Sequence, residues 1–174
     1  MVKNSDEQID RDEIKVLSIL EQNAKETISN IAKKCGFSRQ KTWRIIDTLE
    51  KNGRIWGYTA IPDEAVFGFH HYILLLKRSN VPVQESHRNE IVFEKVDKYL
   101  PGLVKVDDIY YTNGTYDLVI TFYAHDLLDA KRFAQAVFTH NLKIFKEHIL
   151  LDTIFPIRKK SFKNPKIKNL VNFL

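Results

Sequence analysis

Residues 31–53 read IAKKCGFSRQKTWRIIDTLEKNG, and this stretch decides the fold of the first part of the chain. Gly36 can adopt the left-handed conformation that a tight turn between two helices requires. Ser38 is a favoured residue at a helix N-cap, and Gly53 is of the type favoured just after a helix end. The stretch therefore predicts two helices joined by a glycine turn, with the second helix lying between Ser38 and Gly53.

Two further elements are expected on either side of this helix pair. Residues 10–13, Asp-Arg-Asp-Glu, have the form of a capping box, which predicts that a first helix begins at Asp10. Residues 54–60, RIWGYTA, are predicted to form a strand that leads out of the unit. The residues expected to face the core, from their helical spacing, are Ile14, Leu17, Leu20, Ile28, Ile31, Ala32, Thr42, Ile45, Ile46 and Leu49.

The second helix of the pair begins with long polar and basic side chains. A recognition helix in the major groove of DNA needs such donors in its first turns, and its positive N-terminal dipole favours phosphate. The candidate DNA-binding residues are Ser38, Arg39, Gln40, Lys41, Trp43 and Arg44. Trp43 is either a half-buried brace or a groove contact. An ordinary three-helix bundle with a polar face is the alternative, because helix-turn-helix spacing is permissive.

The chain after residue 60 predicts a second, α+β domain. Strands are expected at 69–77, 103–112, 116–124 and 145–155, and helices at about 84–99 and 127–138. The order βαββαβ is the ferredoxin-like arrangement, and Asn113-Gly114 indicates a hairpin. Both helices would cover one face of the sheet. The other face, with Val119 and Tyr123, is expected to contact a partner, most simply a second copy of the chain.

Three stretches of the first sixty residues closely resemble the Lrp/AsnC family of feast/famine regulators, with archaeal members nearest. They are residues 12–24 (DEIKVLSILEQNA), 31–38 (IAKKCGFS) and 49–60 (LEKNGRIWGYTA). The resemblance implies a winged-type helix-turn-helix domain over 1–60, with 54–60 as its linking strand. It also implies a RAM domain over 61–157 that dimerises, often assembles further, and binds amino acids or related molecules. Ile45, Asp47 and Thr48 replace residues that are often basic in relatives, which implies a weaker or different reading of DNA there.

The segment 112–117, TNGTYD, is the part of the chain most similar to the family's effector motif. The resemblance implies an effector site at Gly114, Thr115, Tyr116 and Asp117. Gly114 and Asp117 match the motif, whereas Thr115 stands where an acidic residue is common. A turn that exposes backbone amides beside Asp117 can hold the carboxylate and ammonium groups of an amino acid. The alternative is a plain hairpin whose Asp117 caps the turn.

Composition and spacing give no support for catalysis, and no catalytic residue, metal site or cofactor is expected. His70 and His71 are adjacent on a strand and point to opposite faces, and the other histidines lack ligand spacing. The single cysteine, Cys35, has no partner within the chain. The polar N-terminus and the lack of a long apolar run predict a cytoplasmic protein with no membrane partner.

Together these features predict a sequence-specific transcription regulator that binds double-stranded DNA as a homodimer or higher oligomer. Two alternatives stay open. An architectural protein would coat DNA with little sequence preference. An enzyme like the sirohaem decarboxylases would share the architecture and bind a coloured tetrapyrrole, although those enzymes lack the strand at 56–60.

Residues 158–174 form a basic extension that the family pattern does not explain. Residues 151–174 carry six Lys or Arg and one Asp or Glu, a net charge equal to the +5 of the whole chain. Asn164-Pro165 predicts a helix start, since Asn is a favoured N-cap and Pro a favoured first residue. Ile167, Leu170, Val171 and Leu174 then form an apolar stripe that is expected to dock. A frayed basic tail is the alternative.

Overall fold

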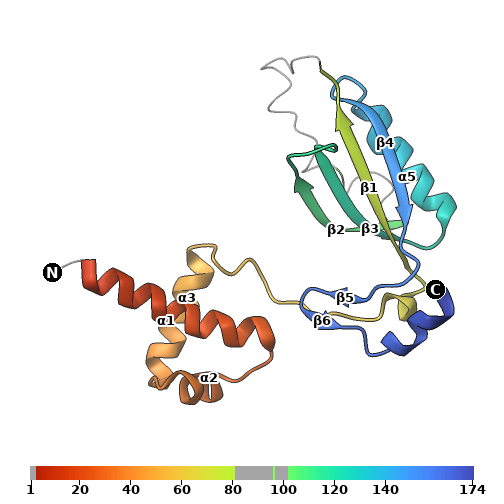
Figure 1. Ribbon diagram of the computed structural model, residues 1–174. Coiled ribbons are helices and arrows are strands. Elements are labelled where there is room, and N and C mark those ends of the chain that lie inside the picture. Colours follow the sequence, from red (N-terminus) through yellow and green to blue (C-terminus); the bar gives the residue numbers. More distant parts are fainter. Residues whose placement is uncertain (1–2, 81–95, 97–101) are drawn as a thin grey trace. The chain divides into compact units, whose positions relative to one another are not determined.

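The structure, a computed structural model, describes residues 3–80, 96 and 102–174 of the chain. The chain divides into two compact units, Met1–Ile61 and Pro62–Leu174, and each has a buried cluster of its own. The first unit is built from the helices α1 (Lys3–Gln22), α2 (Ile28–Cys35) and α3 (Arg39–Lys51) (Figure 1).

The predicted glycine turn between α2 and α3 is confirmed. Gly36 has a φ of 71°, and its N–H donates to the carbonyls of Ala32 and Lys33 at the end of α2. Ser38 caps α3, because its hydroxyl oxygen accepts from the backbone N–H of Lys41. These local bonds satisfy orphan backbone groups at both helix ends, so the turn is determined by its own residues.

The first helix differs from the prediction in its start and in its buried face. It begins at Lys3, before Asp10, so residues 10–13 do not form a capping box. Glu13 is buried, and its carboxylate pairs with the guanidinium of Arg54. In a capping box this carboxylate would accept from the backbone N–H of Asp10. Ile14 is exposed, whereas Val16 is fully buried. The capping motif and the Ile14 spacing were therefore misleading signals.

The core of the first unit joins all three helices. Its buried hydrophobic members are Val16, Leu20, Ile31 and Leu49, with Ile45 and Ile46 packed against them. The predicted strand 54–60 is wrong, because this segment pairs with no other strand among the described residues. Instead the N–H groups of Arg54 and Ile55 both donate to the carbonyl of Leu49, which folds the chain back onto the end of α3.

The second unit contains a four-stranded antiparallel sheet in the order β2-β3-β1-β4. Its elements are η1 (Glu64–Phe67), β1 (His70–Arg78), β2 (Val104–Tyr111), β3 (Leu118–Ala124), α5 (Leu127–His140) and β4 (Phe145–Asp152), followed by β5 (Arg158–Lys159), β6 (Phe162–Lys163) and η3 (Ile167–Phe173). This is the strand order of a ferredoxin-like sheet. The predicted helix 84–99 lies outside the described residues, apart from Val96.

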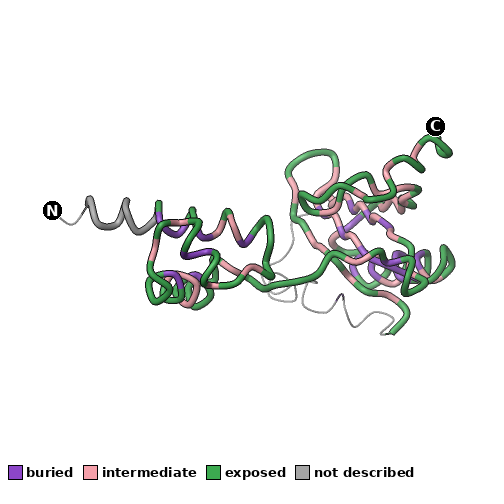
Figure 2. The backbone as a smooth tube through the Cα atoms, turned by 90° about the horizontal axis from the view of Figure 1, so that it is seen from below, coloured by how far each residue is buried: buried purple, intermediate pink, exposed green. Residues whose placement is uncertain are grey.

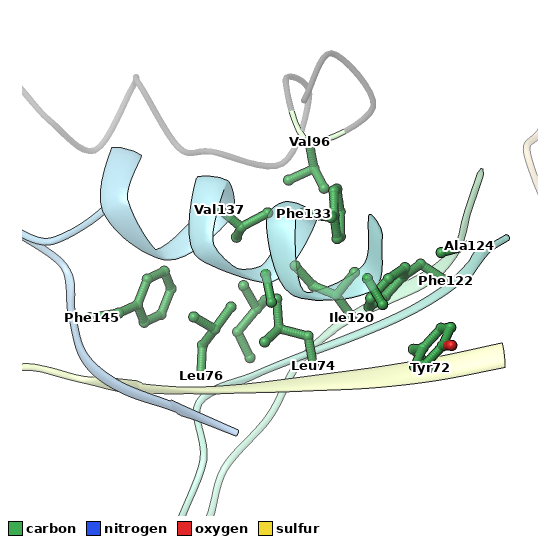
Figure 3. Packing of buried hydrophobic residues seen from close by; sticks show 13 residues of the cluster. Tyr72, Leu74, Leu76, Val96, Ile120, Phe122, Ala124, Phe133, Val137 and Phe145 are labelled. Atoms are coloured by element: carbon green, nitrogen blue, oxygen red, sulfur yellow. The ribbon is translucent and has the colours of Figure 1, made fainter. Parts of the chain in front are cut away.

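The core of this unit fills the space between α5 and one face of the sheet (Figure 3). Leu74 and Leu76 of β1 and Phe122 of β3 project toward Phe133 of α5, and all four are fully buried. Because side chains alternate along a strand, the odd-numbered residues of β1 lie on the other face, which α5 does not cover. Figure 2 shows the buried positions of this unit gathered in its interior.

The hairpin between β2 and β3 is confirmed, but its strands are shorter than predicted. Tyr111 pairs with Leu118, which leaves residues 112–117 as a six-residue loop. The N–H of Thr112 donates to the carbonyl of Asp117 at 2.8 Å, and its hydroxyl donates to the carbonyl of Tyr116 at 2.7 Å. These hydrogen bonds close a loop of residues 112–117, which is longer than the turn predicted between strands ending at 112 and beginning at 116.

The C-terminal extension begins differently from the prediction. Asn164 does not cap an α-helix. Its side-chain oxygen accepts from the N–H of Lys166, its amide donates to the carbonyl of Pro156, and a 3₁₀-helix follows at Ile167–Phe173. Of the predicted apolar stripe, Ile167 and Leu170 are half-buried, whereas Val171 and Leu174 are exposed. The extension therefore docks through part of its stripe.

Candidate DNA-binding surface and effector pocket

The first turns of α3 present an exposed row of polar and basic side chains. Arg39, Gln40 and Arg44 are all exposed. Ser38 caps α3 and so fixes the N-terminal end of the helix. The positive end of the helix dipole lies at this same end. Long donors on a rigid helix start are the arrangement that reads base edges and phosphates in the major groove.

Lys41 has a different environment from its neighbours on α3. Its ammonium group lies 2.6 Å from Oδ2 of Asp12, and 4.2 Å from the centre of the Phe37 ring. Asp12 is only 5% exposed. Lys41 thus holds α3 against α1, a role that differs from the DNA contact that the sequence pattern predicts.

Trp43 lines an apolar cleft in the first unit. The cleft has a volume of about 340 Å³, and its other lining residues are Leu20, Ala24, Glu26, Ile28, Ile31, Ile46, Asp47, Glu50 and Tyr58. Trp43 is 53% exposed, so its ring is partly covered by this wall. This partial cover supports the brace over the groove contact.

Two of the carboxylates that line this cleft have clear partners. Lys34 and Asn30 donate to Glu26 and lower its pKa to about 2, mainly through the hydrogen bond from Lys34. Tyr58 donates to Glu50 at 2.8 Å. Burial and then this bond raise the pKa of Tyr58 to about 12, so that the phenol stays protonated. Since Lys34 pairs with Glu26 and Lys51 pairs with Asp47, neighbouring lysines offset much of the negative charge of the lining.

A second pocket lies beside the loop 112–117 in the second unit. Its volume is about 330 Å³, and its lining residues are Lys77, Arg78, Ser79, Asn80, Gly114, Thr115, Asp117 and Lys146. Three of the four candidate effector residues are thus brought together. Tyr116 is absent from the lining.

Asp117 connects the loop to the sheet. Its Oδ2 accepts from the backbone N–H of Arg78 at 2.8 Å, and its own N–H donates to the carbonyl of Leu76 at 2.9 Å. The carboxylate therefore bonds across to β1 and does not cap its own turn. The sequence does not indicate Lys77, Arg78 and Lys146. The pairing of β1 with β3 places Lys77 and Arg78 beside this loop, and the pairing of β1 with β4 adds Lys146.

A third polar cluster lies on the sheet face that α5 leaves open. Tyr123 was expected to be exposed there, but it is only 4% exposed. Its hydroxyl donates to Asp107 at 3.3 Å, and the ammonium of Lys159 lies 5.4 Å from its ring centre. Lys159 also pairs with Glu64. Burial, followed by Asp107, raises the pKa of Tyr123, and burial lowers the pKa of Lys159. The extension thus covers one end of this face.

Over the ranges 3–80 and 102–174 and at residue 96, no group of three His, Cys, Asp or Glu side chains is placed to hold a metal ion. Within the same residues, no helix is both long and apolar enough to cross a membrane.

The comparisons with known proteins agree with this architecture. Residues 9–55 match the family model of winged helix-turn-helix DNA-binding domains. The chain is 26% identical over 121 residues to the uncharacterised HTH-type transcriptional regulator YugG of Bacillus subtilis, covering 70% of each chain. It is 33% identical over 98 residues to the uncharacterised HTH-type transcriptional regulator PH0061 of Pyrococcus horikoshii, covering 56% of this chain and 64% of that protein.

Solved structures extend the likeness over both units. The crystal structure of PH0061 superposes with a TM-score of 0.66 at 24% identity, covering 88% of this chain and 96% of that one. An AsnC family transcriptional regulator from Agrobacterium tumefaciens gives 0.66 at 20% identity, covering 90% and 97%. The regulator NMB0573 of Neisseria meningitidis, solved as a complex with L-Met, gives 0.65 at 15% identity, covering 94% and 97%.

The first unit is therefore a winged helix-turn-helix domain, and the chain as a whole has the α+β fold of the Lrp/AsnC regulators. The resemblance to this family, drawn from three stretches of the sequence, is confirmed at the level of the fold, and the archaeal protein PH0061 is among the relatives.

Proposed function

We propose that this chain is a cytoplasmic, sequence-specific DNA-binding transcription regulator without enzymatic activity. In this proposal residues 1–60 bind DNA, residues 61–157 dimerise and bind an effector, and residues 158–174 form an extension. The observation that carries the proposal is the exposed, capped start of α3 with Arg39, Gln40 and Arg44. In this proposal Ser38 contacts a phosphate at the same helix end.

Selection of bound fragments from a random DNA library tests the proposal. We expect the full chain to enrich a motif with two half-sites, as a two-fold symmetric reader requires. The double variant Arg39→Ala, Arg44→Ala should lose the motif while keeping its fold. Lys25→Ala, at an exposed position outside α3, is the matched control. Strong binding with no enriched sequence would favour the architectural alternative.

The proposed assembly is a homodimer, with the possibility of higher oligomers built from it. The open face of the sheet carries half-buried apolar side chains at Ile73, Leu75, Val119 and Ile149. A flat apolar sheet face of this kind is stable in water when a second copy covers it.

The proposed effector is an amino acid or a related small molecule, bound in the pocket beside the loop 112–117. The pocket combines the carboxylate of Asp117 with cationic side chains, which are the groups that recognise a zwitterion. The complex of NMB0573 with L-Met supports amino-acid binding in a protein of this fold. The enzyme alternative has a simple test, because a tetrapyrrole-binding protein would be coloured after purification.

A further inference from the structure

The pocket beside the loop 112–117 carries more cationic than anionic groups. Its lining contains Lys77, Arg78 and Lys146 but only one carboxylate, that of Asp117. Glu147, which lies outside the lining, is 3.8 Å from the ammonium of Lys77 and offsets part of that charge. Arg78 and Lys146 therefore remain as the main cations available to a ligand.

The position of Arg78 is fixed from two sides. Its backbone N–H donates to Asp117, and its guanidinium donates to the hydroxyl of Tyr111 at 2.8 Å. The second bond restrains the long side chain near the pocket without neutralising it, because the phenol of Tyr111 is uncharged. A guanidinium that is positioned and unneutralised is a strong donor to a carboxylate.

The loop adds donors of its own. Gly114 and Thr115 are exposed, and their N–H groups make no backbone hydrogen bond among the described residues. Asp117 accepts from Arg78 through Oδ2, which leaves Oδ1 to accept from a ligand. The pocket thus offers one carboxylate oxygen that can accept from an ammonium group of a ligand. Its backbone amides and its cationic side chains can bind more than one carboxylate of that ligand.

Among the residues that the structure describes, the lining has no apolar side chain. Each of its residues is charged, polar or glycine. A leucine or methionine side chain would find no hydrophobic partner there, so its burial would contribute little. A second carboxylate on the ligand would instead find Arg78 or Lys146.

We propose that the effector pocket prefers an amino acid with an acidic side chain, of the aspartate or glutamate class. This inference rests on the proposed function, since it names the ligand class of the same site. The ligand's ammonium group binds Oδ1 of Asp117, and its two carboxylates bind the loop amides and the Arg78 and Lys146 cations. Thr115 contributes by being neutral, because a carboxylate at this position would cancel one of those cations.

Calorimetric titration of the full chain with L-glutamate and with L-glutamine, at constant ionic strength, tests the charge directly. The two ligands have nearly the same shape and differ in one negative charge. We expect L-glutamate to bind about tenfold or more tightly, as a charge-assisted hydrogen bond provides. L-methionine should bind more weakly than L-glutamate.

Two variants locate the effect. Lys146→Gln should weaken L-glutamate by about threefold to tenfold and leave L-glutamine nearly unchanged. Lys143→Gln is the matched control, since Lys143 is exposed, lies close along the chain and does not line the pocket. Thr115→Asp should reduce the ratio of glutamate to glutamine affinity toward one.

Three results would overturn the inference: equal affinity for glutamate and glutamine, tighter binding of methionine, or inorganic phosphate displacing glutamate at equal concentration. The last would indicate a general anion site. The DNA library selection is done separately on the same protein. If the protein selects a specific DNA motif but does not bind L-glutamate, only the inference about the ligand class is refuted. If it binds L-glutamate but selects no DNA motif, the proposed function as a sequence-specific regulator is refuted.

Discussion

The ammonium of Lys41, near the start of α3, lies 2.6 Å from the carboxylate of Asp12 in α1, and Asp12 is almost fully buried. The lysine thereby supplies a cation to a buried carboxylate. Its ammonium group also lies 4.2 Å from the centre of the Phe37 ring in the turn. The angle at which the recognition helix leaves the turn thus depends on a contact inside the unit.

We expect Lys41→Met to lower the free energy of unfolding by about 1–2 kcal/mol, because it removes the ammonium group that pairs with the buried carboxylate of Asp12. The estimate is below that for a fully buried pair, since Lys41 is about half exposed. Chemical denaturation of the full chain measures the change. The double variant Asp12→Asn, Lys41→Met should recover part of the lost stability. Lys33→Met, at an exposed position of α2, is the control. An equal loss of stability in Lys41→Met and Lys33→Met would contradict the pairing.

Trp43→Ala should affect stability and leave base preference unchanged. The ring lines the cleft with Leu20 and Ile46, so its removal costs apolar contact, about 1–2 kcal/mol for a half-exposed aromatic side chain. The binding motif selected by the variant should match that of the parent. A changed base at one motif position would show that Trp43 reads the groove.

The elements of the first unit that were predicted correctly are those with short-range causes. The turn at Gly36 and the cap at Ser38 depend on bonds to residues within four positions, and the sequence displays such bonds directly. The capping box at 10–13 failed because Glu13 has a stronger partner in Arg54, which lies far along the chain. The strand at 54–60 failed because strand formation needs a neighbour, which sequence pattern does not reveal.

The same distinction holds for the candidate sites. Gly114, Thr115 and Asp117 were found because they share one loop, but their cationic neighbours come from β1 and the start of β4. Lys41 looked like its neighbours on α3, and only the packing of α1 against α3 shows its different role. Local pattern therefore identified the loop and the helix, and tertiary contacts determined which side chains are available.

Stability should fall as the pH decreases below about 6.5, with His71 as a contributor. Burial lowers the pKa of His71 from its ordinary 6.5, although Asp107 and Asp108 oppose the shift. The unfolded chain therefore binds a proton more readily than the folded one. The stabilisation is fully present above 6.5 and is lost as the pH falls through the lowered folded-state pKa. His71→Asn should reduce the slope of the unfolding free energy between pH 7 and 5, as chemical denaturation at several pH values measures.

A charge at the centre of the open sheet face should disrupt the proposed dimer. Leu75 lies between Val119 of β3 and Ile149 of β4 in the register of the sheet, and all three are half-buried. Leu75→Asp is expected to give a monomeric mass in light scattering at micromolar concentration. Leu142→Asp is the control, because Leu142 is exposed in the turn before β4. A dimeric Leu75→Asp variant would place the interface elsewhere.

Deletion of residues 164–174 should lower the melting temperature of the second unit. The side-chain amide of Asn164 donates a hydrogen bond to the carbonyl of Pro156. The ammonium of Lys166 lies 2.6 Å from the carboxylate of Asp63, and the ring centres of Phe173 and Phe155 are 5.5 Å apart. The half-buried Ile167 and Leu170 add apolar burial within the extension. The expected loss is about 1–3 kcal/mol, since the ion pair is exposed and contributes little.

The exposed end of the extension gives a second, separable result. Val171 and Leu174 remain exposed on the folded chain, so Val171→Asp, Leu174→Asp should leave the melting temperature of a monomer unchanged. If a neighbouring copy covers these side chains, the double variant should instead reduce the assembled mass at the same protein concentration. A deletion variant that melts and assembles as the full chain does would mean that residues 164–174 are a free basic tail, despite the contacts with Asp63 and Phe155.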